Sequence, residues 1–374
     1  MTTSKLLIGF DAKRIVRNGT GLGSYGRTLV NDLARYPLHL RLYTPDMGRA
    51  DLRQQIVDAP NVEFVTPHPL TFSPSHLLPS LWRSHGIVSD LKRDGIQLYH
   101  GLSGELPIGI SRSGVKSVVT IHDLIFLRHP EFYHWLDTKI YAYKFRRTIQ
   151  EADHIIAISQ CTKHDIMELG GVSESKISLI YQSCSPRFRA SGGAQSPFRY
   201  ILSVGSIEAR KNILLAVKAL PYLPSDVSLV VVGRHTSYTD AVVAYAKQHQ
   251  LLHRLKIMHG VSDAELPALY SGAEAFVYPS VYEGFGIPII EAIGCGLPVV
   301  ACTGSCLEEA GGPHSLYVAP DDVMGMAEAI KCVLKGAEGR EQRIQRSMDY
   351  IRRFNGNDVA GQVVDVYKQV LGCD

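Results

Sequence analysis

The sequence predicts an α/β protein with two doubly wound domains, each built on a parallel sheet. Three observations support this prediction. A chain of 374 residues is too long for one ordinary core and suits two domains of middling size. Short β-branched and apolar runs recur with helical segments between them, which is typical of parallel sheets. A polar stretch rich in Gly, Ser and Pro divides these runs into two series.

The predicted strands fall into a first and a second series along the chain. The first series comprises residues 6–11, 38–43, 62–65, 96–100, 117–122, 154–159 and 176–181, and the second comprises residues 200–205, 227–233, 255–260, 275–279, 298–302 and 315–319. Residues 191–197 form the best linker between the series. We therefore expect domains at 1–188 and 189–355, with a terminal helix at 356–374 that packs back on the first domain.

Composition excludes several classes of protein. Hydrophobic residues at 45% and charged residues at 20% predict a soluble globular chain rather than a disordered one. The formal net charge of +3 is too small to favour nucleic-acid binding. Seven cysteines without CxxC spacing argue against a disulfide framework or a zinc site, and no apolar run indicates a signal peptide or a membrane span. We expect a cytoplasmic protein.

The segment from Glu283 to Glu291 is the clearest candidate site. In parallel sheets ligands lie beyond the carboxyl ends of strands, and this segment follows the strand AFVYP. Gly284 and Gly286 allow close backbone approach, and Pro288 suits the start of a helix whose amides attract phosphate. We expect Glu291 in the first helical turn, where it could simply complement the helix dipole, and Glu283 could simply be solvated. Two glutamates flanking a Gly-Phe-Gly loop favour a site for sugar or ribose hydroxyls.

With this segment, YEGFGIPIIEAIGCGLPVVA, the chain resembles the retaining glycosyltransferases of family 4. The resemblance covers essentially the whole chain and implies the GT-B fold, in which two Rossmann-like domains face each other across a cleft. It implies that Glu283 contacts hydroxyls of the transferred sugar and that Glu291 holds the nucleotide ribose. It also implies that Phe285, Gly286 and Ile287 offer backbone amides to the sugar and phosphates.

A second candidate is SVGSIEARKN, directly after a predicted strand. Arg210 and Lys211 are adjacent cations that could neutralise a departing pyrophosphate without a metal, although a solvated basic pair is equally common. The family resemblance implies that this pair binds the donor diphosphate, with Gly205 and Ser206 nearby. Leaving-group stabilisation by the two cations is thus the expected mechanism, and neither a cofactor nor a metal is expected.

A third candidate is His122, which follows the strand SVVTI. A single His at a strand end is more often structural than catalytic. The resemblance implies that His122 lies against the donor sugar. It also implies, for the loop at Gly260 and Val261, that its backbone reads the nucleobase.

The glycine pattern GLGSYG, from Gly21 to Gly26, supports a rival interpretation. It matches GxGxxG, and Asp46 lies where a ribose-binding acid would be expected, so an NAD-dependent dehydrogenase is an alternative. Residues 12–19 separate the pattern from its strand, whereas a dinucleotide fingerprint follows its strand almost at once. The resemblance instead implies that Gly21 and Gly23 form a loop over the donor phosphates.

The substrates follow only from resemblance. The segments GTGLGSYGRTL and HDLIFLRHPEFY look most like bacterial transferases that add mannose or a related deoxyhexose to surface polysaccharides, so we expect GDP-mannose as donor and a saccharide or lipid-linked acceptor. A UDP-sugar donor is an alternative, and a non-catalytic nucleotide-sugar sensor is another. Residues 134–152 mix aromatic and basic side chains, as in a helix lying on the inner face of the cytoplasmic membrane, but a helix packed on its own sheet is the favoured interpretation.

Overall fold

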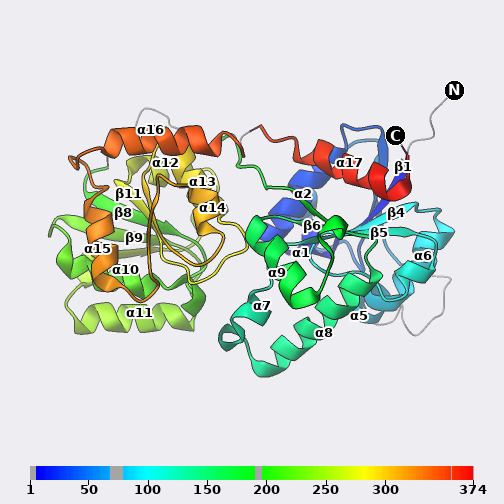
Figure 1. Ribbon diagram of the computed structural model, residues 1–374, viewed down its shortest axis with the longest axis horizontal. Helices are drawn as coiled ribbons and strands as arrows, with labels where there is room; N and C mark the ends of the chain where they lie inside the picture. The colour runs from blue at the N-terminus through cyan, green and yellow to red at the C-terminus, as the bar shows by residue number, and fades with distance from the viewer. Residues whose placement is uncertain (1–5, 68–78, 190–195, 355, 374) are drawn as a thin grey trace. The chain divides into compact units, whose positions relative to one another are not determined.

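The computed structural model describes residues 6–67, 79–189, 196–354 and 356–373. It divides into two compact units, one of Met1–Tyr181 with Asp358–Asp374 and the other of Gln182–Asn357 (Figure 1). The sequence predicts these divisions after residues 188 and 355. Most of the proposed linker at 191–197 lies outside the described residues. No helix in the described part of the chain is long and apolar enough to cross a bilayer.

Unit 1 is built on a seven-stranded parallel sheet with the order β3-β2-β1-β4-β5-β6-β7. Its strands are β1 (Leu6–Asp11), β2 (Leu38–Tyr43), β3 (Val62–Val65), β4 (Leu98–Gly101), β5 (Lys116–Ile121), β6 (His154–Ala157) and β7 (Ile177–Leu179). Its helices and helical turns are α1 (Lys13–Arg17), α2 (Gly21–Leu33), α3 (Ala50–Arg53), α5 (Pro79–Leu81), η1 (Trp82–Gly86), α6 (Ile87–Arg93), η2 (Ile110–Arg112), α7 (Ile125–Arg128), η3 (Pro130–Phe132), α8 (Trp135–Glu151), α9 (Gln160–Gly170), η4 (Glu174–Lys176) and α17 (Val359–Leu371). The predicted first series of strands is therefore one sheet.

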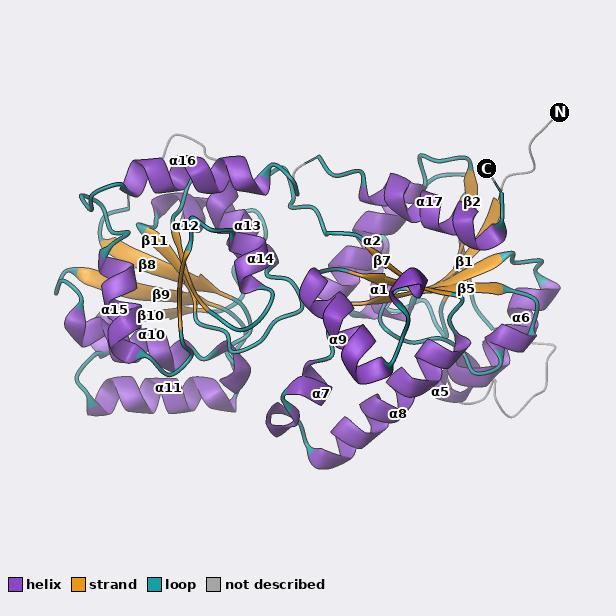
Figure 2. Ribbon diagram, viewed as in Figure 1, coloured by secondary structure: helices purple, strands orange, loops and turns teal. Residues whose placement is uncertain are grey.

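Helices cover both faces of this sheet because its strands are apolar on both sides. On one face, Ile8 and Phe10 of β1 pack with Leu33 of α2 and Tyr367 of α17. On the other face, the core joins Tyr99 of β4 to side chains of η1, α6, α8 and α9. Figure 2 shows α6, α8 and α9 beside the strands of this unit. The last helix of the chain, α17, is thus part of unit 1, although residues 182–357 intervene.

Unit 2 repeats the same plan with six parallel strands in the order β10-β9-β8-β11-β12-β13. Its strands are β8 (Arg199–Val204), β9 (Val227–Val232), β10 (Leu255–Met258), β11 (Ala275–Tyr278), β12 (Val299–Cys302) and β13 (Leu316–Val318). Its helices and helical turns are η5 (Ala209–Lys211), α10 (Ile213–Ala219), η6 (Leu220–Tyr222), α11 (Ser237–Gln248), η7 (Leu252–Arg254), α12 (Leu266–Gly272), α13 (Ile287–Gly294), α14 (Leu307–Gly311), α15 (Val323–Lys331) and α16 (Arg340–Ile351). Helices α10, α11 and α15 cover one face, and α13 and α14 pack against β11 and β12 on the other.

Both sheets therefore share the strand order 3-2-1-4-5-6 of the doubly wound fold. In this order the chain reverses its winding direction between the first and fourth strands, and a crevice opens beyond their carboxyl ends. The reversal lies between β1 and β4 in unit 1 and between β8 and β11 in unit 2. Each unit thus has one place where its topology favours a ligand.

Candidate functional site

Three predicted site residues meet at the carboxyl ends of β8 and β11. Arg210 and Lys211 lie on the short turn η5 after β8, and Glu283 follows β11. Lys211 Nζ lies 2.5 Å from Glu283 Oε1, and Arg210 Nη1 lies 2.9 Å from Glu283 Oε2. The Val281 amide donates to the Arg210 carbonyl at 2.9 Å, which joins the two loops. Strand order explains the contact, because β8 and β11 are neighbours although they are distant in sequence.

The side chains of this cluster are charged and mostly buried. The side chains of Arg210, Lys211 and Glu283 are only 16%, 11% and 11% exposed. Burial alone would raise the pKa of the Glu283 carboxyl, but Lys211 and Arg210 outweigh it and lower that pKa to about 2. Burial opposes the charge on Lys211, yet Glu283 holds the Lys211 pKa above its usual value. All three groups are therefore ionised at neutral pH.

The loop after Glu283 leads into helix α13. Gly286 is the residue before the helix and adopts a φ of +112°, a conformation that suits glycine. The Phe285 side chain is buried and packs edge-on against Phe354, with ring centroids 5.3 Å apart. The Cys306 thiol donates to the carbonyls of Glu283 and Phe285, at 3.1 and 2.9 Å. The backbone from Gly284 to Ile287 is thus fixed at a helix N-terminus, where amides favour anions.

Glu291 lies deeper in α13 than the sequence analysis placed it. The helix begins at Ile287, so Glu291 is its fifth residue and not part of the first turn. This corrects the prediction, because the helix starts at Ile287, one residue before the Pro288 that was expected to open it. Tyr270 donates its hydroxyl to Glu291 Oε2 at 3.0 Å. Burial raises the pKa of the Glu291 carboxyl to about 7, although the Tyr270 hydrogen bond lowers it.

Gly205 connects the cluster to a pocket of 590 Å³ beside β9 and β10. A Cβ at Gly205 would lie 3.6 Å from Lys211 Cε, and a Cβ at Gly233 would meet the Gly205 carbonyl oxygen at 1.9 Å. Gly233 must therefore remain glycine for the two loops to approach. Val261 lines the pocket together with Val232, Gly233, Arg234, His235, His259 and Gly260. Ser206, next to Gly205, donates to Glu208 at 3.0 Å.

His122 belongs to unit 1 and follows β5 directly. Its Nε2 lies 2.9 Å from the Leu102 carbonyl, and its ring packs edge-on against Tyr25 with centroids 4.7 Å apart. Burial lowers the pKa of His122 to about 4, so its imidazole is neutral at physiological pH. A neutral ring that donates one N–H can position a substrate hydroxyl but carries no charge.

The predicted glycine loop of unit 1 is in fact the start of a helix. Gly21 and Gly23 are the first and third residues of α2, and the whole GxGxxG pattern lies inside that helix. Helix α1 separates it from β1, so the pattern is not the strand-turn-helix fingerprint of a dinucleotide site. Gly23 is needed for packing, since a Cβ there would lie 1.8 Å from the Asn18 carbonyl oxygen. Asp46, the candidate ribose acid, is paired with Arg17.

Sequence reasoning missed three polar partners of the site. Tyr278 accepts a hydrogen bond from Lys211 Nζ at 2.7 Å and places its ring under that amine. Glu208 pairs with Arg210 at 2.8 Å, and Tyr270 holds Glu291. Tyr278 is the last residue of β11, so its position at a strand end was a signal that could have identified it. Tyr270 lies inside α12 and had no such signal.

Comparisons with known proteins identify the family. Residues 19–185 match the model of "Glycosyltransferase Family 4", and residues 185–349 match "Glycosyl transferases group 1". The O-antigen chain mannosyltransferase RfbU of Salmonella typhimurium is 30% identical over 69% of this chain and 68% of its own length. The O-antigen chain mannosyltransferase B of Escherichia coli is 29% identical over 72% of this chain and 74% of its own.

Solved structures with the same fold cover nearly the whole chain. Sucrose-phosphate synthase from Thermosynechococcus elongatus has a TM-score of 0.78 at 20% identity and covers 98% of this chain and 100% of its own. Anabaena HepE, solved with UDP and glucose, has a TM-score of 0.72 at 17% identity and covers 97% of this chain and 99% of its own. The chain has the GT-B fold and belongs to glycosyltransferase family 4, a family of retaining hexosyltransferases.

Proposed function

We propose that this chain transfers mannose from GDP-mannose, with retention, to a saccharide or lipid-linked acceptor in surface polysaccharide synthesis. The observation that carries the proposal is the buried cluster of Arg210, Lys211 and Glu283 at the β8/β11 reversal. Two cations beside the N-terminus of α13 form a site for a diphosphate. The O-antigen mannosyltransferases of Escherichia coli and Salmonella typhimurium support the choice of sugar.

In this proposal the donor spans unit 2 from the pocket to the cluster. The nucleobase lies against the loop at Val261, and Glu291 accepts hydrogen bonds from the ribose. The diphosphate lies between Arg210, Lys211 and the backbone of Gly205 and Ser206. Gly205 joins these regions, because it touches both the Lys211 side chain and the Gly233 loop that lines the pocket.

The sugar lies against the remaining groups. Glu283 accepts hydrogen bonds from its hydroxyls, and the backbone of Gly284, Phe285, Gly286 and Ile287 donates to the sugar and phosphates. His122, together with Gly21 and Gly23 at the start of α2, contributes from unit 1. The neutral His122 adds no charge there, and because its Nε2–H donates to the Leu102 carbonyl, its other ring nitrogen acts only as an acceptor.

Arrival of the donor changes the partners of the two cations. In the structure Glu283 contacts both Lys211 and Arg210, and Glu208 pairs with Arg210, so two carboxylates balance the two cations. A bound diphosphate supplies a stronger counter-anion at the same place, which releases Glu283 to accept from the sugar hydroxyls. The carboxylate thus keeps the empty site stable and contacts the sugar in the occupied one.

The expected reaction is driven by stabilisation of the leaving group. As the bond between the anomeric carbon and the diphosphate oxygen breaks, Arg210, Lys211 and the α13 amides stabilise the negative charge on the leaving nucleoside diphosphate. The acceptor hydroxyl attacks the anomeric carbon from the leaving-group face. Its proton passes to a phosphate oxygen of the departing diphosphate, so no side chain is required as the base.

The variants Glu283→Ala and Lys211→Ala test the assignment. Each should reduce mannose transfer to background, because each removes a group from the reacting centre. The exposed side chains of Glu338 and Lys247 provide matched controls, and alanine at these positions should leave transfer unchanged. Transfer near the wild-type rate in either site variant would contradict the proposal, provided that circular dichroism shows a folded protein.

The donor is tested by measuring nucleotide release from GDP-mannose and from UDP-glucose in parallel, with buffer that contains no nucleotide sugar as the blank. GDP release with GDP-mannose alone supports the proposal. UDP release would favour the second candidate donor, which has support in HepE from Anabaena, a structural neighbour solved with UDP and glucose. Tight binding of a nucleotide sugar without turnover in the presence of acceptor extracts would instead indicate a sensor. Thermal-shift titrations with GDP, UDP and ADP, with and without chelator, check the base and the metal requirement.

A further inference from the structure

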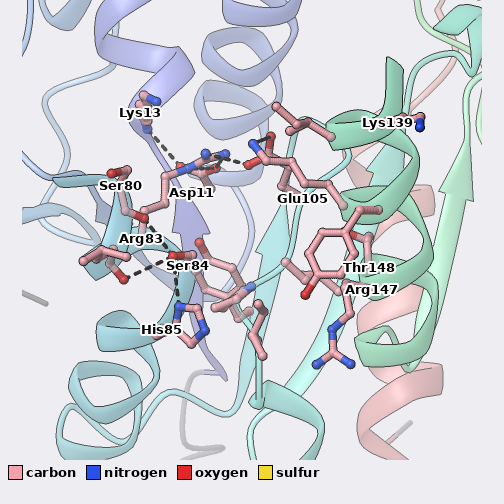
Figure 3. Close-up of a pocket in the computed structure, with 18 residues that line it drawn as sticks. Asp11, Lys13, Ser80, Arg83, Ser84, His85, Glu105, Lys139, Arg147 and Thr148 are labelled. Carbon is pink, nitrogen blue, oxygen red and sulfur yellow. Dashed lines mark hydrogen bonds and ion pairs between the residues drawn. The ribbon is translucent and has the colours of Figure 1, made fainter. Parts of the chain in front are cut away.

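Unit 1 has buried polar side chains on both faces of its sheet. On the face covered by α8, Arg83 donates to Asp11 and to Glu105, each at 2.6 Å, and Figure 3 shows these ion pairs at the wall of a cavity. On the face covered by α2 and α17, His100 and Thr120 are fully buried beside the apolar core. Burial of polar groups costs free energy that aliphatic side chains would avoid, so these two residues need another explanation.

The two residues belong to a continuous network of hydrogen bonds between α17 and α2. The hydroxyl of Tyr367 in α17 lies 2.6 Å from His100 Nδ1, and His100 Nε2 lies 2.9 Å from Thr120 Oγ1. Thr120 Oγ1 also lies 3.1 Å from the hydroxyl oxygen of Tyr25 in α2. Burial lowers the pKa of His100 to about 3, so its ring is neutral and has one donor and one acceptor nitrogen. We call these four side chains the support network: Tyr367, His100, Thr120 and Tyr25.

The support network ends at the side chain that the proposed function places against the sugar. Thr120 precedes His122 by two residues, and Tyr25 contacts both of them. The Tyr25 hydroxyl reaches Thr120, and its ring packs edge-on against the His122 ring, with centroids 4.7 Å apart and planes at 85°. The His122 ring also contacts the Leu102 carbonyl through Nε2, at 2.9 Å. One of these two ring contacts therefore depends on the hydrogen bond that holds Tyr25.

The neighbouring strands β4 and β5 make the same kind of contact twice. His100 bonds Thr120, and two residues further along each strand, Leu102 bonds His122. The first contact lies deeper in the sheet and the second at the carboxyl ends of the strands, and Tyr25 spans the two. A hydrogen bond fixes direction as well as distance, so it holds the Tyr25 ring more narrowly than apolar packing would.

We propose that the support network is a set of positioning residues for His122. It fixes the His122 ring in the orientation that lets its acceptor nitrogen meet a hydroxyl of the sugar. The Leu102 carbonyl holds the Nε2–H, so Nδ1 is the nitrogen that accepts, and the Tyr25 ring prevents the imidazole from turning. The effect on transfer rests on the proposed function, whereas the fixed orientation of the ring does not.

The test removes one hydroxyl at a time and keeps the shape of the side chain. Tyr25→Phe and Tyr367→Phe delete one oxygen at either end of the network. Thr120→Val removes the central hydroxyl, and Thr120→Ser keeps it. Tyr36→Phe is the matched control, because the Tyr36 hydroxyl also reaches α17, through its N-cap residue Asp358 at 2.6 Å, but lies beyond the opposite end of α2. Tyr25 is only partly buried, so its variant keeps the test valid even where Thr120→Val does not fold.

The first measurement is nitrogen NMR of the full chain with isotope-labelled histidine, which reports the tautomer of each neutral ring without any substrate. The His122 signal is assigned by its absence in His122→Gln. We expect the Nε2–H tautomer alone in wild type, Thr120→Ser and Tyr36→Phe. Both tautomers should appear in Tyr25→Phe and Thr120→Val, and a smaller change in Tyr367→Phe. An unchanged His122 signal in Tyr25→Phe and Thr120→Val would overturn the proposal, and a change confined to Tyr25→Phe would remove the rest of the network from it.

The second measurement is a double-mutant cycle on sugar transfer, with kcat and KM determined separately. We expect Tyr25→Phe to lower kcat about tenfold and Tyr36→Phe less than about twofold, because a misplaced contact weakens the transition state most. In the His122→Ala background Tyr25→Phe should cause no further loss, because it acts through His122. A loss of equal size in both backgrounds, or one that follows the melting temperature, would show a purely structural role and overturn the proposal.

The two measurements separate this proposal from the proposed function. If wild type releases no nucleotide from any nucleotide sugar while the His122 tautomer responds as expected, the proposed function fails and the support network stands. If wild type transfers sugar while the His122 tautomer is the same in every variant, the support network fails and the proposed function stands.

Discussion

Replacement of Glu291 by glutamine should change how the stability of unit 2 depends on pH. The Glu291 carboxyl has a pKa of about 7 in the folded chain, against 4.5 in its unperturbed state, because α13 buries it. Between these two values the unfolded chain ionises while the folded chain stays protonated, so stability falls as the pH rises. A shift of this size corresponds to roughly 3 kcal/mol lost by about pH 8. Glutamine keeps the acceptor for Tyr270 but does not titrate.

The assay compares melting temperatures of wild type and Glu291→Gln at acidic and mildly alkaline pH. The melting temperature of the variant should rise relative to that of wild type as the pH increases from about 5 to 8. For a domain of this size, 3 kcal/mol corresponds to a difference of roughly 6–12 °C. Glu338→Gln is the control, because Glu338 is exposed and its replacement should not alter the pH dependence. A constant difference between Glu291→Gln and wild type across this range would refute the reasoning.

The same substitution tests the proposed contact with ribose. Ribose hydroxyls donate more strongly to an ionised carboxylate than to a neutral one, so GDP binding should tighten as the pH rises through about 7. This rise should be absent in Glu291→Gln. Binding that weakens with rising pH in wild type would contradict a role for Glu291 in holding the ribose.

The other predictions concern charge and packing. Glu283→Gln leaves the buried Lys211 without its carboxylate and Arg210 with Glu208 alone, so the stability of the nucleotide-free protein should fall by about 3–5 kcal/mol in a melting assay. Saturating GDP should restore most of this stability while transfer stays impaired. Gly23→Ala should unfold or strongly destabilise the chain through its clash with Asn18, whereas Gly21→Ala, with open space around its Cβ, should be neutral or stabilise by up to about 1 kcal/mol in the same melting assay. Because His122 is neutral above pH 4, His122→Gln should lower the transfer rate without changing the shape of the pH–rate profile between roughly pH 5.5 and 8.

The sequence was sufficient to predict the doubly wound sheets, and the structure and its relatives confirm them. Strand order then explains why Arg210 and Glu283 meet, since residues after strands that flank a reversal converge. Other features depended on tertiary packing. Gly21 and Gly23 resembled a loop, but both lie in helix α2, where close approach to the backbone of Asn18 requires glycine at position 23. The roles given to these residues stay predictions.

The pKa of Glu291 was also beyond sequence reasoning, for a different physical reason. A pattern of residues shows that a carboxyl belongs to a helix, but not how far the helix start has shifted or which hydroxyl reaches it. Because α13 begins at Ile287, one residue before Pro288, Glu291 lies beyond the first turn, away from the strongest field of the helix amides. The same early start places it against Tyr270, where burial raises the pKa of its carboxyl. Small errors in an element boundary can therefore reverse the charge state inferred for a residue.

Glu283 connects the stability of this site with its proposed chemistry. Two cations at 16% and 11% exposure cannot be left uncompensated in a folded domain, because the desolvation of each costs several kcal/mol. A site preorganised for a diphosphate must therefore contain an anion while it is empty, and that anion must give way when the substrate binds. A carboxylate on the loop before α13 meets both needs, since it is held by ion pairs that a diphosphate can replace. Deleting Glu283 would therefore affect folding and transfer together, and only an uncharged isostere examined with and without GDP can separate the two effects.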